Sequence, residues 1–202
     1  MLTIHADSRG HALAVRGERI EAAGPLAELS AGHPHARVRT WPGILTPGFV
    51  NLHGTELLER AYHPDPREAD TLGAEPLTGD ALRALALDDA RWGASARRGV
   101  QRMLAHGTVA SACEPFRIRA VQDAVRRTGL TVLPRPHHPG GTPSLDPLAS
   151  DLPPETPPAR TPGSAACFAV FDVQDETELT ERGTTATCVA TVIAGRLLFR
   201  RR

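Results

Sequence analysis

The sequence predicts a fold of the α/β plus β class. Short strand patterns joined by turns occupy both ends of the chain, and a compact strand–helix–strand pattern lies between them. A proline-rich segment, with 10 prolines in residues 134–162, separates this central pattern from the C-terminal strands. Strands joined by tight turns pair antiparallel, whereas a helix between two strands implies parallel pairing with a right-handed crossover.

The N-terminal strands are indicated by alternation and by turn residues. An apolar run at 12–15 is followed by a charged turn and a second short run at 20–23, which predicts a hairpin. Residues 37–41 alternate with period two, as in a half-buried strand. Residues 44–52 are mostly apolar at consecutive positions, which predicts one strand covered on both faces.

The central pattern begins after a helical region at 79–105. Small and β-branched residues at 108–113 predict a strand, and Pro115 is expected to open a helix that Gly129 ends. Residues 130–133 predict the next strand, parallel to the first.

The proline-rich segment cannot continue a helix or pair throughout its length in a sheet, so we expect a linker or a surface loop. Beyond it, residues 167–173 predict a strand, and 187–193 with 196–200 predict a hairpin. Neither chain end has enough strands for a stable sheet of its own. The simplest arrangement therefore pairs the C-terminal strands with the N-terminal ones.

Composition excludes several classes of protein. The 202 residues contain 23 basic residues, all arginine, and 23 acidic residues, so no basic surface for nucleic acid is expected. The longest apolar stretch is about half the roughly 20 residues that span a bilayer, so no membrane segment is expected. Three cysteines without Cys-x-x-Cys spacing support neither a disulfide framework nor a zinc ribbon. We expect a soluble cytoplasmic protein.

Residues 47–53 (PGFVNLH) match the motif Pro-Gly-hydrophobic-Val-Asn-x-His-x-His. With this motif the chain resembles the metal-dependent amidohydrolase superfamily, in particular its imidazolonepropionase-like and aminodeoxyfutalosine deaminase-like members. Residues 16–25 are similar to the N-terminal hairpin of that family's β-sandwich. Residues 169–172 and 190–199 are similar to the strands that complete the sandwich.

The resemblance implies a specific division of the chain. Residues 1–43 and 165–202 would form a composite β-sandwich, and residues 44–133 a partial (β/α) barrel of about three units. Residues 134–164 would be the proline-rich linker. A full barrel needs on the order of 200 residues by itself, so about five units are missing and the barrel is truncated.

The resemblance also implies a metal site at the end of the first barrel strand. His53 stands at the position of the first histidine ligand, but Thr55 replaces the second, and threonine is a poor zinc ligand. Glu56 and Glu59 could assist His53 in holding zinc or another divalent metal. Alternatively, the two glutamates are a solvated helix start and His53 is a structural histidine. No catalytic residue is assigned.

Other candidate residues have weaker signals. His33 and His35 form a His-x-His in a polar turn, which is typical of a surface loop. His137 and His138 lie within the proline-rich segment. Cys113 ends a predicted parallel strand and could pair with a histidine as an activated thiolate, or it could be a small buried residue.

Two functions remain open. The first is that of an amidohydrolase-like protein, whose family activity is hydrolysis of non-peptide C–N bonds in small cyclic amides or amidines. The missing ligands predict that this activity is weak or absent in this chain alone. The second is a non-catalytic binding or assembly protein, a pseudoenzyme derived from an amidohydrolase. The expected partners are a small cyclic nitrogen metabolite and further copies of the chain, because a truncated barrel leaves strand edges unpaired.

Overall fold

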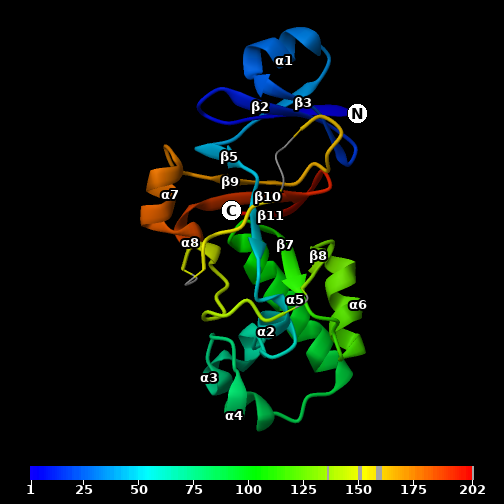
Figure 1. The fold of residues 1–202 in the computed structure, drawn as a ribbon, viewed down its shortest axis with the longest axis vertical. Helices are drawn as coiled ribbons and strands as arrows, with labels where there is room; N and C mark the ends of the chain where they lie inside the picture. The colour runs from blue at the N-terminus through cyan, green and yellow to red at the C-terminus, as the bar shows by residue number, and fades with distance from the viewer. Residues whose placement is uncertain (136, 150–151, 158–160, 202) are drawn as a thin grey trace.

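The computed structural model describes residues 1–135, 137–149, 152–157 and 161–201. Three sheets follow one another along the long axis of the molecule (Figure 1). Two have four strands each, and the third has three strands and is accompanied by the longest helices. The predicted mixed α/β class is therefore confirmed.

The first sheet consists of the N-terminal strands in the order β3-β2-β1-β4. These are β1 (Leu2–Ala6), β2 (His11–Arg16), β3 (Arg19–Pro25) and β4 (Arg37–Thr40). The predicted hairpin is β2–β3, and β1 lies outside the predicted strands. Helix α1 (Leu26–Gly32) packs on this sheet through a small apolar cluster that includes Ile4 and Leu29.

The second sheet joins segments that are far apart in the sequence. Its order is β11-β10-β9-β5, and its strands are β5 (Ile44–Thr46), β9 (Phe168–Phe171), β10 (Cys188–Ile193) and β11 (Arg196–Arg200). Strand β5 pairs antiparallel with β9, with Leu45 opposite Val170. A buried cluster that includes Leu13, Trp41 and Phe168 joins this sheet to the first. Helices α7 (Glu176–Arg182) and α8 (Thr184–Thr187) connect β9 to β10.

The predicted single strand over residues 44–52 is wrong. The chain forms two short strands, β5 and β6 (Phe49–Asn51), which belong to different sheets. Pro47 and Gly48 separate them, and Gly48 has a φ of +79°, a conformation that glycine adopts without steric cost. The predicted domain boundary at residues 43 and 44 stays a prediction, although β5 pairs with a C-terminal strand.

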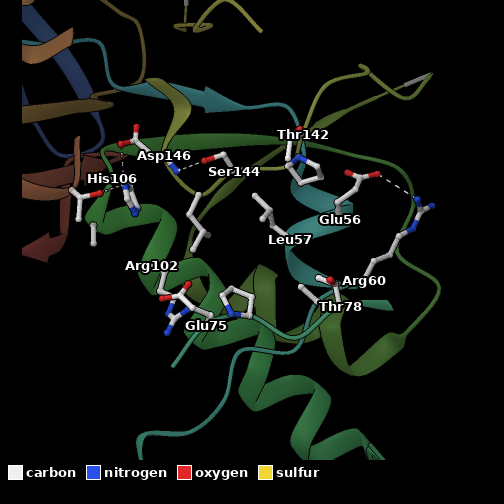
Figure 2. A pocket seen from close by; sticks show the side chains of 16 residues that line it. Glu56, Leu57, Arg60, Glu75, Thr78, Arg102, His106, Thr142, Ser144 and Asp146 are labelled. Carbon is white, nitrogen blue, oxygen red and sulfur yellow. Dashed lines mark hydrogen bonds and ion pairs between the residues drawn. The ribbon is translucent and has the colours of Figure 1, made fainter. Parts of the chain in front are cut away.

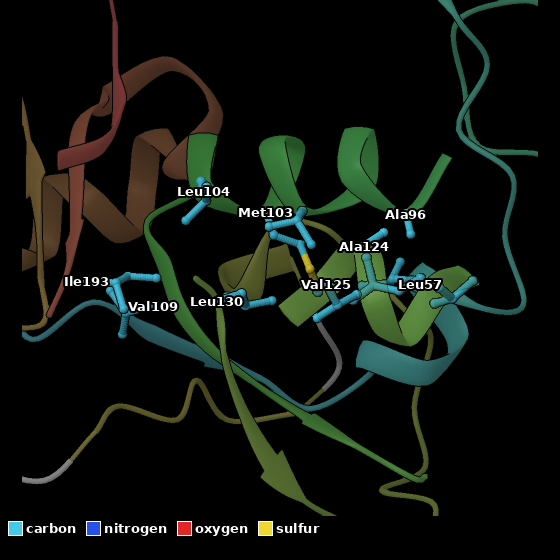
Figure 3. Close-up of a cluster of buried hydrophobic side chains, with 12 residues drawn as sticks. Leu57, Ala96, Met103, Leu104, Val109, Ala124, Val125, Leu130 and Ile193 are labelled. Atoms are coloured by element: carbon cyan, nitrogen blue, oxygen red, sulfur yellow. The ribbon is translucent and has the colours of Figure 1, made fainter. Parts of the chain in front are cut away.

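The third sheet is parallel and has the order β6-β7-β8, with β7 (Thr108–Cys113) and β8 (Thr131–Pro134). Helices α5 (Asp89–Ala105) and α6 (Arg119–Thr128) pack together beside it. The predicted strand–helix–strand pattern is confirmed, but α6 begins at Arg119 rather than Pro115. Figure 3 shows the shared core, in which Met103 and Val125 are completely or almost completely buried.

Short helices complete the described fold. They are α2 (Gly54–Leu58), α3 (Ala69–Leu72) and α4 (Gly79–Arg83), with 3-10 turns at Pro66–Glu68 and Pro147–Ala149. Within the described ranges, no helix has both the length and the apolar character needed to cross a bilayer. The cytoplasmic location stays a prediction.

Candidate functional site

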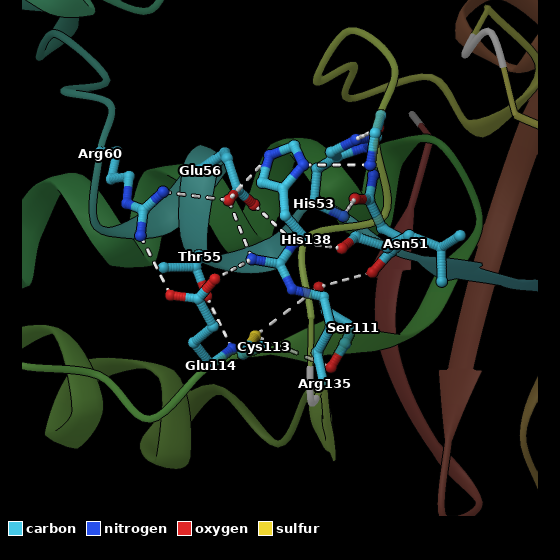
Figure 4. Close-up of polar contacts among 12 residues, drawn as sticks. Asn51, His53, Thr55, Glu56, Arg60, Ser111, Cys113, Glu114, Arg135 and His138 are labelled. Carbon is cyan, nitrogen blue, oxygen red and sulfur yellow. Dashed lines mark hydrogen bonds and ion pairs between the residues drawn. The ribbon is translucent and has the colours of Figure 1, made fainter.

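Three polar residues follow the ends of the three parallel strands. His53 lies after β6, Glu114 after β7 and Arg135 after β8. Because the carboxyl ends of parallel strands meet at one edge of a sheet, the three positions come together there. Glu56 of α2 completes this group, and Figure 4 shows the side chains converging. We call His53, Glu56, Glu114 and Arg135 the strand-end cluster.

Arg135 is the central cation of the cluster. Its side chain is only 5% exposed, and it holds Glu56 in a bidentate pair, with Nη1–Oε2 and Nη2–Oε1 distances of 2.8 and 2.9 Å. Nη2 also donates to Glu114 Oε1 at 2.9 Å, and Nη1 donates to the carbonyl of Leu52 at 2.8 Å. Charge-assisted bidentate bonds of this kind are strong and fix both partners in orientation.

The environment of Glu56 keeps its carboxylate charged. Burial on its own would raise its pKa, but the hydrogen bond from Arg135 and the charges of Arg135 and Arg60 leave the pKa below its ordinary value. Arg60, which is half exposed, lies 3.4 Å from Glu56 and 3.0 Å from Glu114. Two carboxylates and two guanidiniums thus form one charge-balanced network.

His53 is buried and bonded on its ring. Its backbone N–H donates to Asn51 Oδ1 at 2.9 Å, and its Nε2 lies 2.8 Å from the carbonyl oxygen of Gly140. A carbonyl oxygen only accepts, so Nε2 carries a proton in this arrangement. Nε2 then has no lone pair to offer a metal ion, and Nδ1 is the one ring nitrogen that keeps a lone pair. The proline-rich segment, to which Gly140 belongs, therefore covers Nε2.

Thr55 and Glu59 have structural partners. Thr55 Oγ1 accepts the backbone N–H of Glu114 at 2.9 Å. Glu59 Oε1 accepts the backbone N–H groups of Arg117 and Ile118, both at 2.7 Å. Ile118 is the N-cap of α6 and offers no capping side chain, so Glu59, at the C-cap of α2, caps this helix.

The alternative interpretation, in which Glu56 and Glu59 are solvated residues at a helix start, is wrong. Glu56 and Glu59 are each 9% exposed, and both accept hydrogen bonds from defined partners. Buried carboxylates are tolerated because these donors replace water.

The contact of α2 with β7 requires a glycine. A side-chain carbon at Gly54 would clash with Ser111 Oγ and Cys113 Sγ. We therefore expect Gly54→Ala to reduce the free energy of unfolding by about 1–3 kcal/mol, as overpacking does. Gly32→Ala is the matched control, because nothing lies within 4 Å of the added carbon. Equal urea midpoints for the two variants would contradict this close packing.

The remaining candidates do not assemble a reactive group. Cys113 is 3% exposed, its Sγ lies 3.8 Å from the carbonyl oxygen of Ser111, and burial raises its pKa to about 11, all of which favour the small buried residue over the activated thiolate. His138 Nε2 lies 3.5 Å from Glu56 Oε1, on the exposed side of the cluster. His33 is the C-cap of α1, and His35 is exposed in the following turn, as the surface-loop interpretation predicts.

The donor set does not fit a divalent metal ion. His53 Nε2 bonds to a carbonyl, Glu56 binds a guanidinium, and Glu59 caps a helix. Among the residues described by the structure, no three histidine, cysteine or acidic side chains are placed to hold a metal together. Metal ligation by His53, Glu56 and Glu59 thus stays a prediction that this geometry does not support.

A pocket of about 880 Å³ adjoins the cluster on the side of α2 and α5 (Figure 2). Leu57 contributes to its apolar wall, while Arg102 and His106 line its far end. His106 Nδ1 lies 2.7 Å from Thr184 Oγ1 and 3.9 Å from Asp146 Oδ2. Burial lowers the pKa of His106, although Asp146 opposes this effect.

Comparison with known proteins identifies the N-terminal segment. Residues 12–36 match the family model of the imidazolonepropionase-like composite domain of bacteria. The predicted resemblance is confirmed over this segment. The imidazolonepropionase-like segment comprises most of β2, all of β3 and α1. No curated protein sequence matches the chain.

Solved structures that are similar to the chain cover it only in part. An adenosine deaminase from Xanthomonas campestris with bound zinc matches with a TM-score of 0.45, 18% identity and 65% coverage of this chain. Ochratoxinase from A. niger matches with a TM-score of 0.44, 17% identity and 66% coverage. An amidohydrolase from an environmental sample of the Sargasso Sea matches with a TM-score of 0.41, 19% identity and 77% coverage of this chain. The chain spans only 32%, 30% and 39% of these three structures.

Arg135 is not among the residues that the sequence patterns single out. The available signal was its position, directly after the third parallel strand and next to a proline, where a side chain projects from the carboxyl edge of the sheet. Its partner Glu56 lies 79 residues earlier, which no local pattern reveals.

Proposed function

We propose that this chain is an amidohydrolase-like protein that does not hydrolyse C–N bonds on its own and acts as a binding protein. The observation that carries the proposal is the bidentate pair of Arg135 and Glu56. Arginine stays protonated at every physiological pH, so this cation does not leave the carboxylate by losing its proton.

The chemistry of metal-dependent hydrolysis explains why this pair matters. A catalytic zinc site uses about three protein ligands and lowers the pKa of a bound water to about 7. A guanidinium donates hydrogen bonds but offers no position at which a water could be bound and deprotonated. With Arg135 at the centre of the acidic cluster, no group of three metal-ligating side chains in the described part of the chain supplies that step.

The division of the chain supports an origin in this family. The first two sheets share a buried core that contains residues from both chain ends, as a composite β-sandwich formed by 1–43 and 165–202 would require. The parallel sheet supplies three strands, as the partial barrel of residues 44–133 would require. The linker of residues 134–164 would then replace the missing barrel units.

The pocket beside α2 and α5 is the proposed binding site. Its volume of about 880 Å³ falls within the usual range for small-molecule sites. Arg102, Glu75 and His106 provide donors and an acceptor around an apolar wall. These groups suit a small polar ring with both donors and acceptors, as in a cyclic nitrogen metabolite.

Hydrolysis and metal binding test the proposal together. The chain, incubated with hydantoin as a cyclic amide, is expected to show no ring opening with or without added zinc chloride. Added zinc is also expected to leave the thermal midpoint unchanged, because only a ligand that binds the native state raises it. Zinc-dependent ring opening that is lost in His53→Ala would instead restore the hydrolase, with metal ligands completed by a second subunit.

A further inference from the structure

Strand β8 forms an open edge of the parallel sheet. The opposite edge, β6, is covered by the proline-rich segment, since Val50 donates its backbone N–H to the carbonyl of Glu155 at 2.8 Å. In the described part of the chain, β8 pairs with β7 alone. All four residues of β8 are exposed, and the apolar side chains of Val132 and Leu133 are 44% and 38% exposed. Exposed apolar edges of this kind promote pairing with another strand.

The register shows which backbone groups face outward. Thr131 lies opposite Ala110 and Leu133 opposite Ala112, and Arg135 donates its N–H to the carbonyl of Cys113 at 3.0 Å. Residues of a strand direct their N–H and C=O to one side and the other in alternation. Arg135, Leu133 and Thr131 therefore bond to β7, and Val132 directs both its N–H and its C=O to the open side.

A groove of about 970 Å³ runs beside this edge. Phe116, Val125 and Leu130 contribute to its apolar lining, and Glu114 and Arg126 are among its charged residues. Glu114 follows the carboxyl end of β7, whereas Arg126 lies in the last turn of α6, near the point where β8 begins. The two side chains therefore lie toward opposite ends of the groove. Within one copy, Glu114 already bonds Arg135 and Arg60, and Arg126 pairs with Asp123 at 3.0 Å, so a contact between copies would extend these networks rather than satisfy free charges.

We propose that two copies of this chain associate through β8, about a two-fold axis at Val132, to form a continuous six-stranded sheet. In an antiparallel pair centred there, the two Val132 residues exchange two N–H···O bonds. The two-fold axis also makes the grooves of the two copies run in opposite directions, so that Arg126 of each copy lies toward Glu114 of the other. A surface with opposite charges at its two ends is complementary to itself under two-fold symmetry.

The same features limit the strength of the association. Pro134 has no N–H to donate, and the backbone N–H of Leu130 already donates to Thr128 Oγ1 at 3.3 Å. The pairing thus relies on one residue pair and on the apolar groove. We expect a reversible dimer whose population rises across the micromolar range.

Sedimentation velocity over that range tests the dimer with three variants of Val132 and with Arg126→Glu. Val132→Pro removes the outward N–H but no bond to β7, and is expected to weaken association by about tenfold or more. Val132→Lys places like charges on the two sides of the two-fold axis. It is expected to weaken association by a similar factor without altering the backbone. Val132→Thr keeps the backbone and the β-branch, and is the matched control that should still dimerise.

The outcomes are distinct. A dimer that is lost in Val132→Pro and Val132→Lys, retained in Val132→Thr and weakened in Arg126→Glu supports the proposal. A monomer at high micromolar concentration would overturn it. A dimer unaffected by Val132→Lys in a folded protein would also overturn it, because the copies would then associate elsewhere. Should Val132→Pro fail to fold, Val132→Lys alone decides between these outcomes.

Discussion

Replacing Arg135 by methionine is expected to lower the free energy of unfolding by about 3–5 kcal/mol, the usual cost of removing one partner of a buried ion pair. Glu56, 9% exposed, would lose a bidentate partner, and Glu114 would lose one donor. Methionine keeps much of the arginine side-chain volume, so the loss reflects the charge rather than a cavity. Urea unfolding followed by circular dichroism measures the change.

Arg60→Gln is the matched control. Arg60 contacts the same two glutamates, but its side chain is 52% exposed. Exposed ion pairs contribute about 0–1 kcal/mol, so this variant should remain close to the wild type. In Arg135→Met, the further change Glu56→Gln should recover part of the lost stability by removing an unpaired buried charge. Similar losses in Arg60→Gln and Arg135→Met would show that Arg135 has no special role.

Acid is expected to destabilise the fold well above the pKa of the carboxylates. Burial, assisted by nearby arginines, lowers the pKa of His5 and of His63 from 6.5 to about 4. His5 Nδ1 accepts a bond from Trp41 Nε1 at 3.1 Å, and His63 Nε2 donates to the carbonyl of Leu57 at 2.7 Å. Protonating His5 would remove the acceptor for Trp41.

The direction of this pH effect follows from the number of protons that the folded and unfolded states bind. Both histidines are neutral in the folded and unfolded states at pH 8, so their full contribution is present above pH 6.5. Below that value the unfolded chain binds protons first, and stability falls until the folded histidines titrate near pH 4. Between pH 6.5 and pH 4, each histidine is expected to lower the free energy of unfolding by roughly 3 kcal/mol.

Urea unfolding between pH 8 and pH 4 measures this slope. His5→Gln is expected to flatten the slope by somewhat less than half, because burial also lowers the pKa of His106. His11→Gln is the control, because the His11 side chain is 67% exposed. A free energy of unfolding that stays constant between pH 7 and pH 5 would contradict the burial of neutral His5 and His63.

Local patterns predicted the elements whose neighbours lie close in the sequence. The β2–β3 hairpin, strand β7 and the stop of α6 at Gly129 follow from alternation, from β-branched residues and from a glycine in the left-handed conformation. The continuous apolar run at 44–52 was misleading, because β5 and β6 are both buried although they lie in different sheets. Apolar character alone does not reveal that a chain changes sheets at Pro47 and Gly48.

The candidate site was predictable in position but not in chemistry. The motif at 47–53 located the carboxyl end of a parallel strand, and His53 lies there. What Glu56 and Glu59 bind depends on residues that fold back from later elements, Arg135 after β8 and the N-terminus of α6. Such long-range contacts leave no periodic signal in the sequence.

The metal content of the purified protein tests the central role of Arg135 most directly. Elemental analysis of protein prepared without chelator should find far less than one zinc, iron or manganese per chain, because Arg135 already neutralises Glu56 and His53 Nε2 carries a proton bonded to Gly140. One equivalent of metal per chain that is lost in His53→Ala would contradict this account, since the strand-end cluster would then hold a metal in solution.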